Sequence, residues 1–127
     1  MSTKPIIKIT AILGGLILFA GAVFHFTGTG LVKGAVAGVE SDFLRHALPA
    51  MWVMVSVHWI FIACLSIGLS WYRSRACAAM LMGLGLWLLV DALFVFLHVG
   101  GFIGGYMLLL AGGLILLSGV LLRRALS

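Results

Sequence analysis

Residues 76–98 read ACAAMLMGLGLWLLVDALFVFLH, an almost unbroken apolar run that contains a single acidic residue, Asp91. About 20 helical residues cross a hydrocarbon core of ~30 Å, because each residue rises ~1.5 Å. Backbone groups in lipid must be satisfied within their own segment, so such a run forms a helix rather than a strand. The stretch therefore predicts a membrane-spanning helix with a polar group inside it.

Three further runs meet the same criterion, at residues 6–26, 48–71 and 102–122. The chain is 64% hydrophobic and 9% charged, whereas a soluble domain has about 25% charged residues. We expect an all-α integral membrane four-helix bundle that forms one domain, residues 1–127, with an outer loop at 27–47. Within that loop, Ser41 is expected to cap a short helix that ends before Pro49.

The basic residues predict the orientation of these spans. If the helices alternate, six of the eight basic residues share one side, namely Lys4, Lys8, Arg73, Arg75, Arg123 and Arg124. Basic loops stay in the cytoplasm, so the N and C termini are both expected there, in a bacterial inner (plasma) membrane. Contact with the lipid bilayer explains the net charge of +5, and nucleic acid is not expected as a partner.

Glycines recur every seven residues in the first and last spans, at Gly14 and Gly21 and at Gly105, Gly112 and Gly119. Small residues at such spacings let membrane helices approach closely. We expect these two helices to be the most closely packed elements, with each other as one possible pairing. The alternative use of these faces is contact with a second copy of the chain, giving a homo-oligomer, or with another membrane protein.

The polar residues inside the spans predict a pocket. His58 is expected ~15 Å below the outer end of its helix, and Asp91 ~10 Å below His98. Trp87, Asp91, Phe94 and His98 share a helix face that should point inward. An intramembrane acid is paired, protonated or exposed to water. Asp91 and His58 would form the pocket floor, or alternatively a structural hydrogen bond, and the mouth would be lined by His98, His25 and His46.

Two cofactor hypotheses follow from the same residues. Met51, Met54 and His58 share a helix face, and thioether with imidazole suits copper. Histidine with the Asp91 carboxylate suits zinc, and His25 with His98 would be the axial pair of a haem. No cofactor is the leading expectation. The sequence has no nucleophile elbow, phosphate loop or metalloprotease motif, so an enzyme is not predicted.

The stretch DFLRHALPAMW, residues 42–52, follows a glycine-rich first helix and a long loop. This layout resembles the small four-helix DoxX-like bacterial membrane proteins of unknown function. The resemblance implies a fold and a membrane location rather than an activity.

Three functions stay open. The leading one is a non-catalytic bundle or accessory subunit with an outward-facing polar pocket. The alternatives are a small proton- or metal-ion-handling transporter that uses Asp91 and His58, and a metal or haem redox protein.

Overall fold

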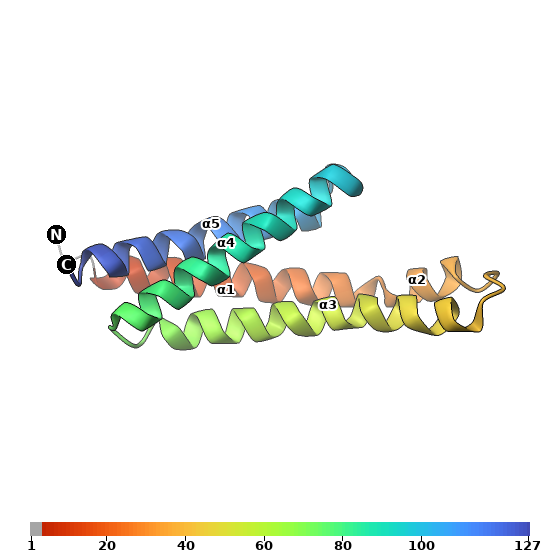
Figure 1. The fold of residues 1–127 in the computed structure, drawn as a ribbon, viewed down its shortest axis with the longest axis horizontal. Helices are drawn as coiled ribbons and strands as arrows, with labels where there is room; N and C mark the ends of the chain where they lie inside the picture. Colours follow the sequence, from red (N-terminus) through yellow and green to blue (C-terminus); the bar gives the residue numbers. More distant parts are fainter. Residues whose placement is uncertain (1–3) are drawn as a thin grey trace.

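A computed structural model describes residues 4–127, apart from the side chain of Lys4. The described chain is helical and contains no strand, as expected for an all-α fold (Figure 1). Its elements are α1 (Lys4–Thr27), α2 (Thr29–Ala35), α3 (Asp42–Leu69), α4 (Arg75–His98) and α5 (Ile103–Arg124). Four helical segments are long and apolar enough to cross a membrane, at Pro5–Ala35, Asp42–Leu69, Arg75–His98 and Ile103–Arg124.

Helix α3 begins at Asp42, six residues before the apolar run that starts at residue 48. The predicted cap is confirmed, because the Ser41 hydroxyl accepts a hydrogen bond from the Leu44 amide at 3.4 Å. The predicted end before Pro49 is wrong, since α3 continues through this proline to Leu69. Proline removes one helical hydrogen bond. Ending the helix beside an apolar run would leave more backbone groups without partners.

Much of the expected outer loop is helical. Gly28 keeps a right-handed helical conformation (φ −71°, ψ −7°), so α2 follows α1 almost without interruption. Only residues 36–41 connect α2 to α3. The 28 residues of α3 extend over ~42 Å, which exceeds a hydrocarbon core of ~30 Å. Figure 1 shows that α2 and the first turns of α3 pair with each other beyond the end of the α4–α5 hairpin.

The closest helix pair is α4 with α5. On α5, a side-chain carbon at Gly119 would lie 2.7 Å from the Met82 amide, and one at Gly112 would lie 3.0 Å from the Gly85 carbonyl. Gly105 likewise lies against Val95 and Phe96 of α4. The glycine face of the last span therefore packs mainly against the preceding helix, and α5 also packs against the first span, as suggested.

The first helix lies between α3 and α5. A side-chain carbon at Gly14 would meet the Ala111 carbonyl of α5 at 3.0 Å, and one at Gly15 would meet the Ala63 carbonyl of α3 at 3.1 Å. Gly21 also faces α5, with Met107 as its neighbour. Packing within the chain therefore occupies both predicted glycine faces.

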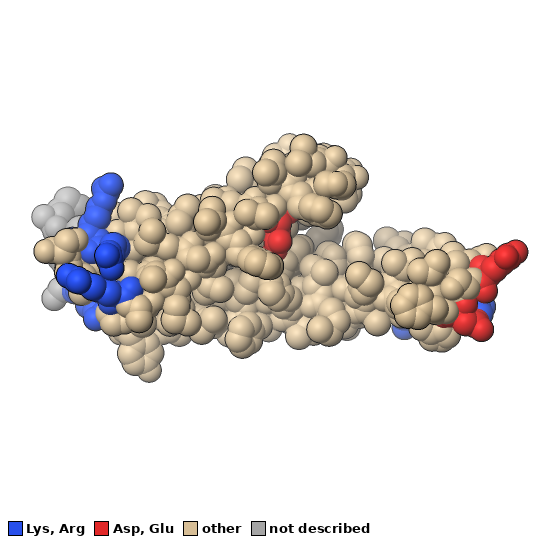
Figure 2. All heavy atoms as spheres, viewed as in Figure 1, with Lys and Arg blue, Asp and Glu red and all other residues tan. Residues whose placement is uncertain are grey.

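Helices α3 and α4 are consecutive but make few contacts with each other. From the short connection at residues 70–74 they diverge, so that the α4–α5 pair leans away from α1 and α3 (Figure 1). Figure 2 shows lysine and arginine side chains gathered at the end of the molecule where the two described ends of the chain lie. The divergence opens a cleft along one side of the protein.

Candidate functional site: the cleft between α3 and α4

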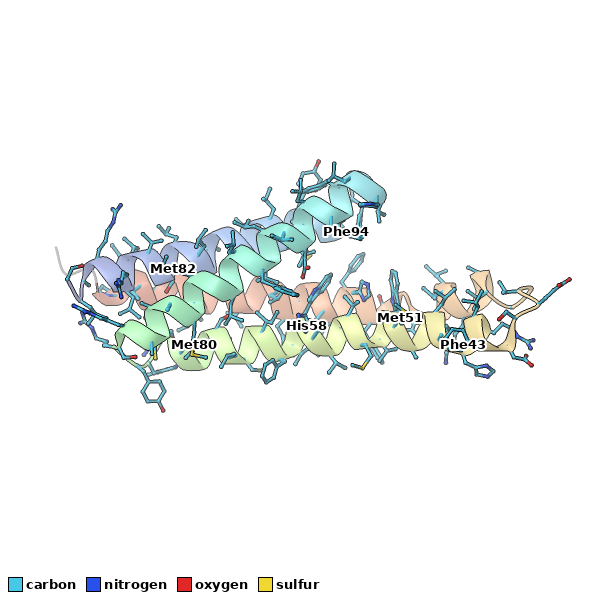
Figure 3. The ribbon with its side chains drawn as sticks, in the orientation of Figure 1. Phe43, Met51, His58, Met80, Met82 and Phe94 are labelled. Atoms are coloured by element: carbon cyan, nitrogen blue, oxygen red, sulfur yellow. The ribbon has the colours of Figure 1, made fainter. Side chains whose placement is uncertain are left out.

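The cleft has a volume of about 500 Å³ and lies between α3 and α4, which diverge from their connection (Figure 1). Its walls are mainly apolar and aromatic. From α3 come Met51, Met54, Val55, His58 and Trp59, from α4 come Trp87, Asp91, Phe94 and Val95, and α5 adds Leu108. Figure 3 shows Met51 and His58 of α3, and Phe94 of α4, on the sides of their helices that border this space.

Asp91 and His58 are brought into the same cleft, as their depths predict. Asp91 is partly buried, and His58 and Trp87 line the cleft beside it. Among the described residues, no ion pair joins Asp91 to another side chain. Figure 2 shows an acidic side chain in the hollow beneath the α4–α5 hairpin, away from the other acidic side chains. The carboxylate therefore faces an open space.

The α4 face that carries Asp91 does not point into the core. Trp87 is 57% exposed and Phe94 is 61% exposed, so the prediction of an inward-facing stripe is wrong. The buried face of α4 comprises Ala78, Leu81, Gly85, Leu88 and Ala92, and its Ala78, Gly85 and Leu88 lie against glycines or Leu116 of α5. Trp87, Asp91 and Phe94 of this stripe border the cleft instead.

A second hollow of about 430 Å³ adjoins the cleft and shares His58 and Trp87 with it. The rings of these two residues lie 6.4 Å apart at an angle of 52°. The remaining lining is apolar and comprises Phe61, Ile62, Met80, Gly83 and Leu84. The cleft thus has an apolar extension along α3 and α4.

All four weak candidates for a metal site, Met51, Met54, His58 and Asp91, line the cleft. Within residues 4–127, however, no three His, Cys, Asp or Glu side chains are close enough together to hold a metal ion. Beside His58 and Asp91, the candidate ligands in the cleft are the sulfur atoms of Met51 and Met54.

His25 lies in a different environment, between α1 and α3. Its Nδ1 atom is 2.9 Å from the Ser56 hydroxyl, and its ring stacks on Trp52 with centroids 3.8 Å apart. The Trp52 indole in turn donates a hydrogen bond to the His25 carbonyl at 2.8 Å. A cavity of about 270 Å³ borders this group. Trp59, only 6% exposed, lines both this cavity and the α3–α4 cleft.

His46 and His98 lie outside the cleft lining. Both are exposed, and each has its Nδ1 atom near a carbonyl of its own helix, Asp42 at 2.8 Å and Phe94 at 3.0 Å. His46 borders a groove with Lys33 and Arg45, and the His98 ring stacks on Phe94. The five predicted pocket residues therefore divide among separate places, and the haem pair His25 and His98 shares no described cavity.

Sequence reasoning missed Trp59, Ser56 and Trp52, which link α3 to its neighbours. Ser56 is 1% exposed, and a lone serine within an apolar run gives little indication of its partner. The spacing of Trp52, Ser56 and Trp59 by four and three residues was the available signal, because it places them on one face of a helix.

No known family pattern, curated protein or solved structure matches the chain.

Proposed function

We propose that the chain is a non-catalytic, multi-pass membrane protein that binds a small membrane-soluble molecule in the α3–α4 cleft, alone or as an accessory subunit. The observation that carries this proposal is the open position of Asp91 among aromatic and apolar walls. An acid at membrane depth is costly and commonly marks a functional site. In this proposal both termini lie in the cytoplasm of a bacterial plasma membrane, and the cleft opens in the outer half.

The volume of the cleft supports a small ligand over a partner helix. Small-molecule sites occupy about 300–1,000 Å³ and combine apolar walls with a few polar groups. A helix of 30 Å length and 10 Å diameter fills roughly 2,400 Å³, several times the cleft volume of about 500 Å³. The cleft therefore suits a molecule of drug or lipid-head size.

Native mass spectrometry of the protein released from nanodiscs tests the proposal. Val55 borders the cleft, whereas Val57 is exposed and lies outside its lining. Wild type and Val57→Trp should both retain a bound molecule of low mass, and Val55→Trp should lose it because the indole fills the space. A wild type that carries no such molecule, with all three proteins identical, argues against a binding site.

A second candidate is proton handling. His58 and Asp91 line one cleft, and these residue types form proton relays in membranes. Proteoliposomes with an internal pH dye would report proton flux, which Asp91→Asn should abolish. Wild-type vesicles no leakier than protein-free ones would exclude this function. The metal and redox alternatives have weaker support, and elemental analysis and visible absorbance of the purified protein test them.

A further inference from the structure

The cleft contains an acidic side chain but no lysine or arginine among its described lining residues. The acidic side chain is that of Asp91. On the face drawn in Figure 2, the lysine and arginine side chains lie at the two ends of the molecule rather than in its middle. Among the described residues of the cleft, the carboxylate thus has no lysine or arginine as a counter-charge.

The walls around the carboxylate are aromatic. Trp87 and Phe94 stand on the same face of α4, one turn to either side of Asp91, and both are more than half exposed toward the opening. Trp59 closes the opposite side from α3. Exposed faces of tryptophan and phenylalanine attract cations, most strongly where water is excluded. Met51 and Met54 add soft, adaptable apolar surface at the α3 wall.

The hollow beyond the His58–Trp87 pair extends this surface toward the α3–α4 connection. It is lined by apolar groups apart from the shared His58. A ligand that places a cationic centre at Asp91 would therefore find apolar surface for the rest of its body on both sides of that pair. A small hydrated metal ion or a simple ammonium ion would leave this surface unused.

From this arrangement we propose that the cleft binds lipophilic organic cations, with the positive centre between Asp91, Trp87 and Phe94 and the apolar body along α3. This assignment rests on the proposed function, because it names the ligand class of the same cleft. It also excludes anionic lipids and uncharged apolar molecules as preferred occupants.

The test uses the full chain in zwitterionic nanodiscs and three probes of similar size and different charge. These are the tetraphenylphosphonium cation, the tetraphenylborate anion and neutral triphenylphosphine oxide. Equilibrium dialysis measures binding, and empty nanodiscs report partitioning into lipid. The cation should bind saturably and at least about tenfold more tightly than either other probe, which corresponds to about 1.4 kcal/mol.

Matched variants locate the binding charge. Asp91→Asn should weaken cation binding by at least about tenfold, and Asp91→Glu should retain it because the charge is kept. Glu40→Gln is the control, since it removes one negative charge from an exposed position outside the cleft. Size-exclusion profiles and helical circular dichroism of each variant establish that it is folded. If Asp91→Asn does not fold, the binding of the three probes to the wild type, Asp91→Glu and Glu40→Gln still tests whether the cleft prefers the cation.

The outcomes distinguish the assignment of a cationic ligand from the proposed binding function of the cleft. Equal binding of the neutral probe and the cation, both lost in Val55→Trp, would overturn the cation assignment and leave a site for apolar molecules. Cation binding that Asp91→Asn leaves unchanged would also overturn the assignment. If no probe binds beyond the empty-disc level and Val55→Trp changes nothing, the binding function itself is overturned.

Discussion

The Nδ1 atom of His25 lies 2.9 Å from the Ser56 hydroxyl and thereby joins α1 to α3. The same imidazole stacks on Trp52 at a centroid distance of 3.8 Å. Ser56 is buried, and the imidazole is the side-chain partner of its hydroxyl. This histidine belongs to the contact that holds α3 beside α1, rather than to the open cleft where Asp91 lies.

His25→Ala should therefore destabilise the fold, by about 1–2 kcal/mol, because it removes an interhelical hydrogen bond and a ring contact. His98→Ala is the matched control. Its imidazole is exposed and its polar contact is with a carbonyl of its own helix, so the effect should stay below about 0.5 kcal/mol. Reversible unfolding in mixed detergent micelles measures both, and equal losses would contradict a special role for His25.

Gly119 and Gly113 of α5 provide a second matched pair of a test substitution and its control. A side-chain carbon at Gly119 would come within 2.7 Å of the Met82 amide, whereas at Gly113 it would meet nothing within 4 Å. Gly119→Ala should destabilise by about 1–3 kcal/mol through overpacking. Gly113→Ala should be neutral or slightly stabilising. The same unfolding assay applies, and a tolerated Gly119→Ala would show that α4 and α5 are not in close contact there.

Two buried serines differ in their partners. The Ser118 hydroxyl of α5 donates to the Ile7 carbonyl of α1 at 2.8 Å, while the Ser66 hydroxyl has no hydrogen-bond partner among the described residues. Ser118→Ala should reduce stability by about 0.6–1.7 kcal/mol, the range of such bonds between membrane helices. Ser66→Ala should have no effect or stabilise the protein. A larger loss of stability from Ser66→Ala than from Ser118→Ala would contradict this interpretation.

The topology proposal is open to cysteine labelling in intact cells. With Cys64 and Cys77 replaced by alanine, Gly38→Cys in the 36–41 connection should react with a membrane-impermeant thiol reagent added outside. Ser74→Cys, in the connection that carries Arg73 and Arg75, should react only after the cells are opened. The opposite pattern would place both termini outside and would move the cleft opening to the cytoplasmic half.

Several parts of this structure were predictable from local sequence. The four long helices follow from the lengths of the apolar runs, and the start of α3 follows from Ser41. That Asp91 and His58 border one space follows from their similar depth on consecutive helices. The gap between these helices was not predictable, because the sequence gives each helix several apolar faces and does not say which one is buried.

The positions of the four long spans and the end that carries most basic residues follow from local sequence, because span length and charge are properties of each segment alone. Which helix faces meet depends on tertiary packing. Gly85 of α4 packs on α5 and Ala63 of α3 lies against α1, so the small residues that permit close approach are used elsewhere. Trp87 and His58 are left between α3 and α4, and these bulky side chains stand where the two helices diverge around Asp91.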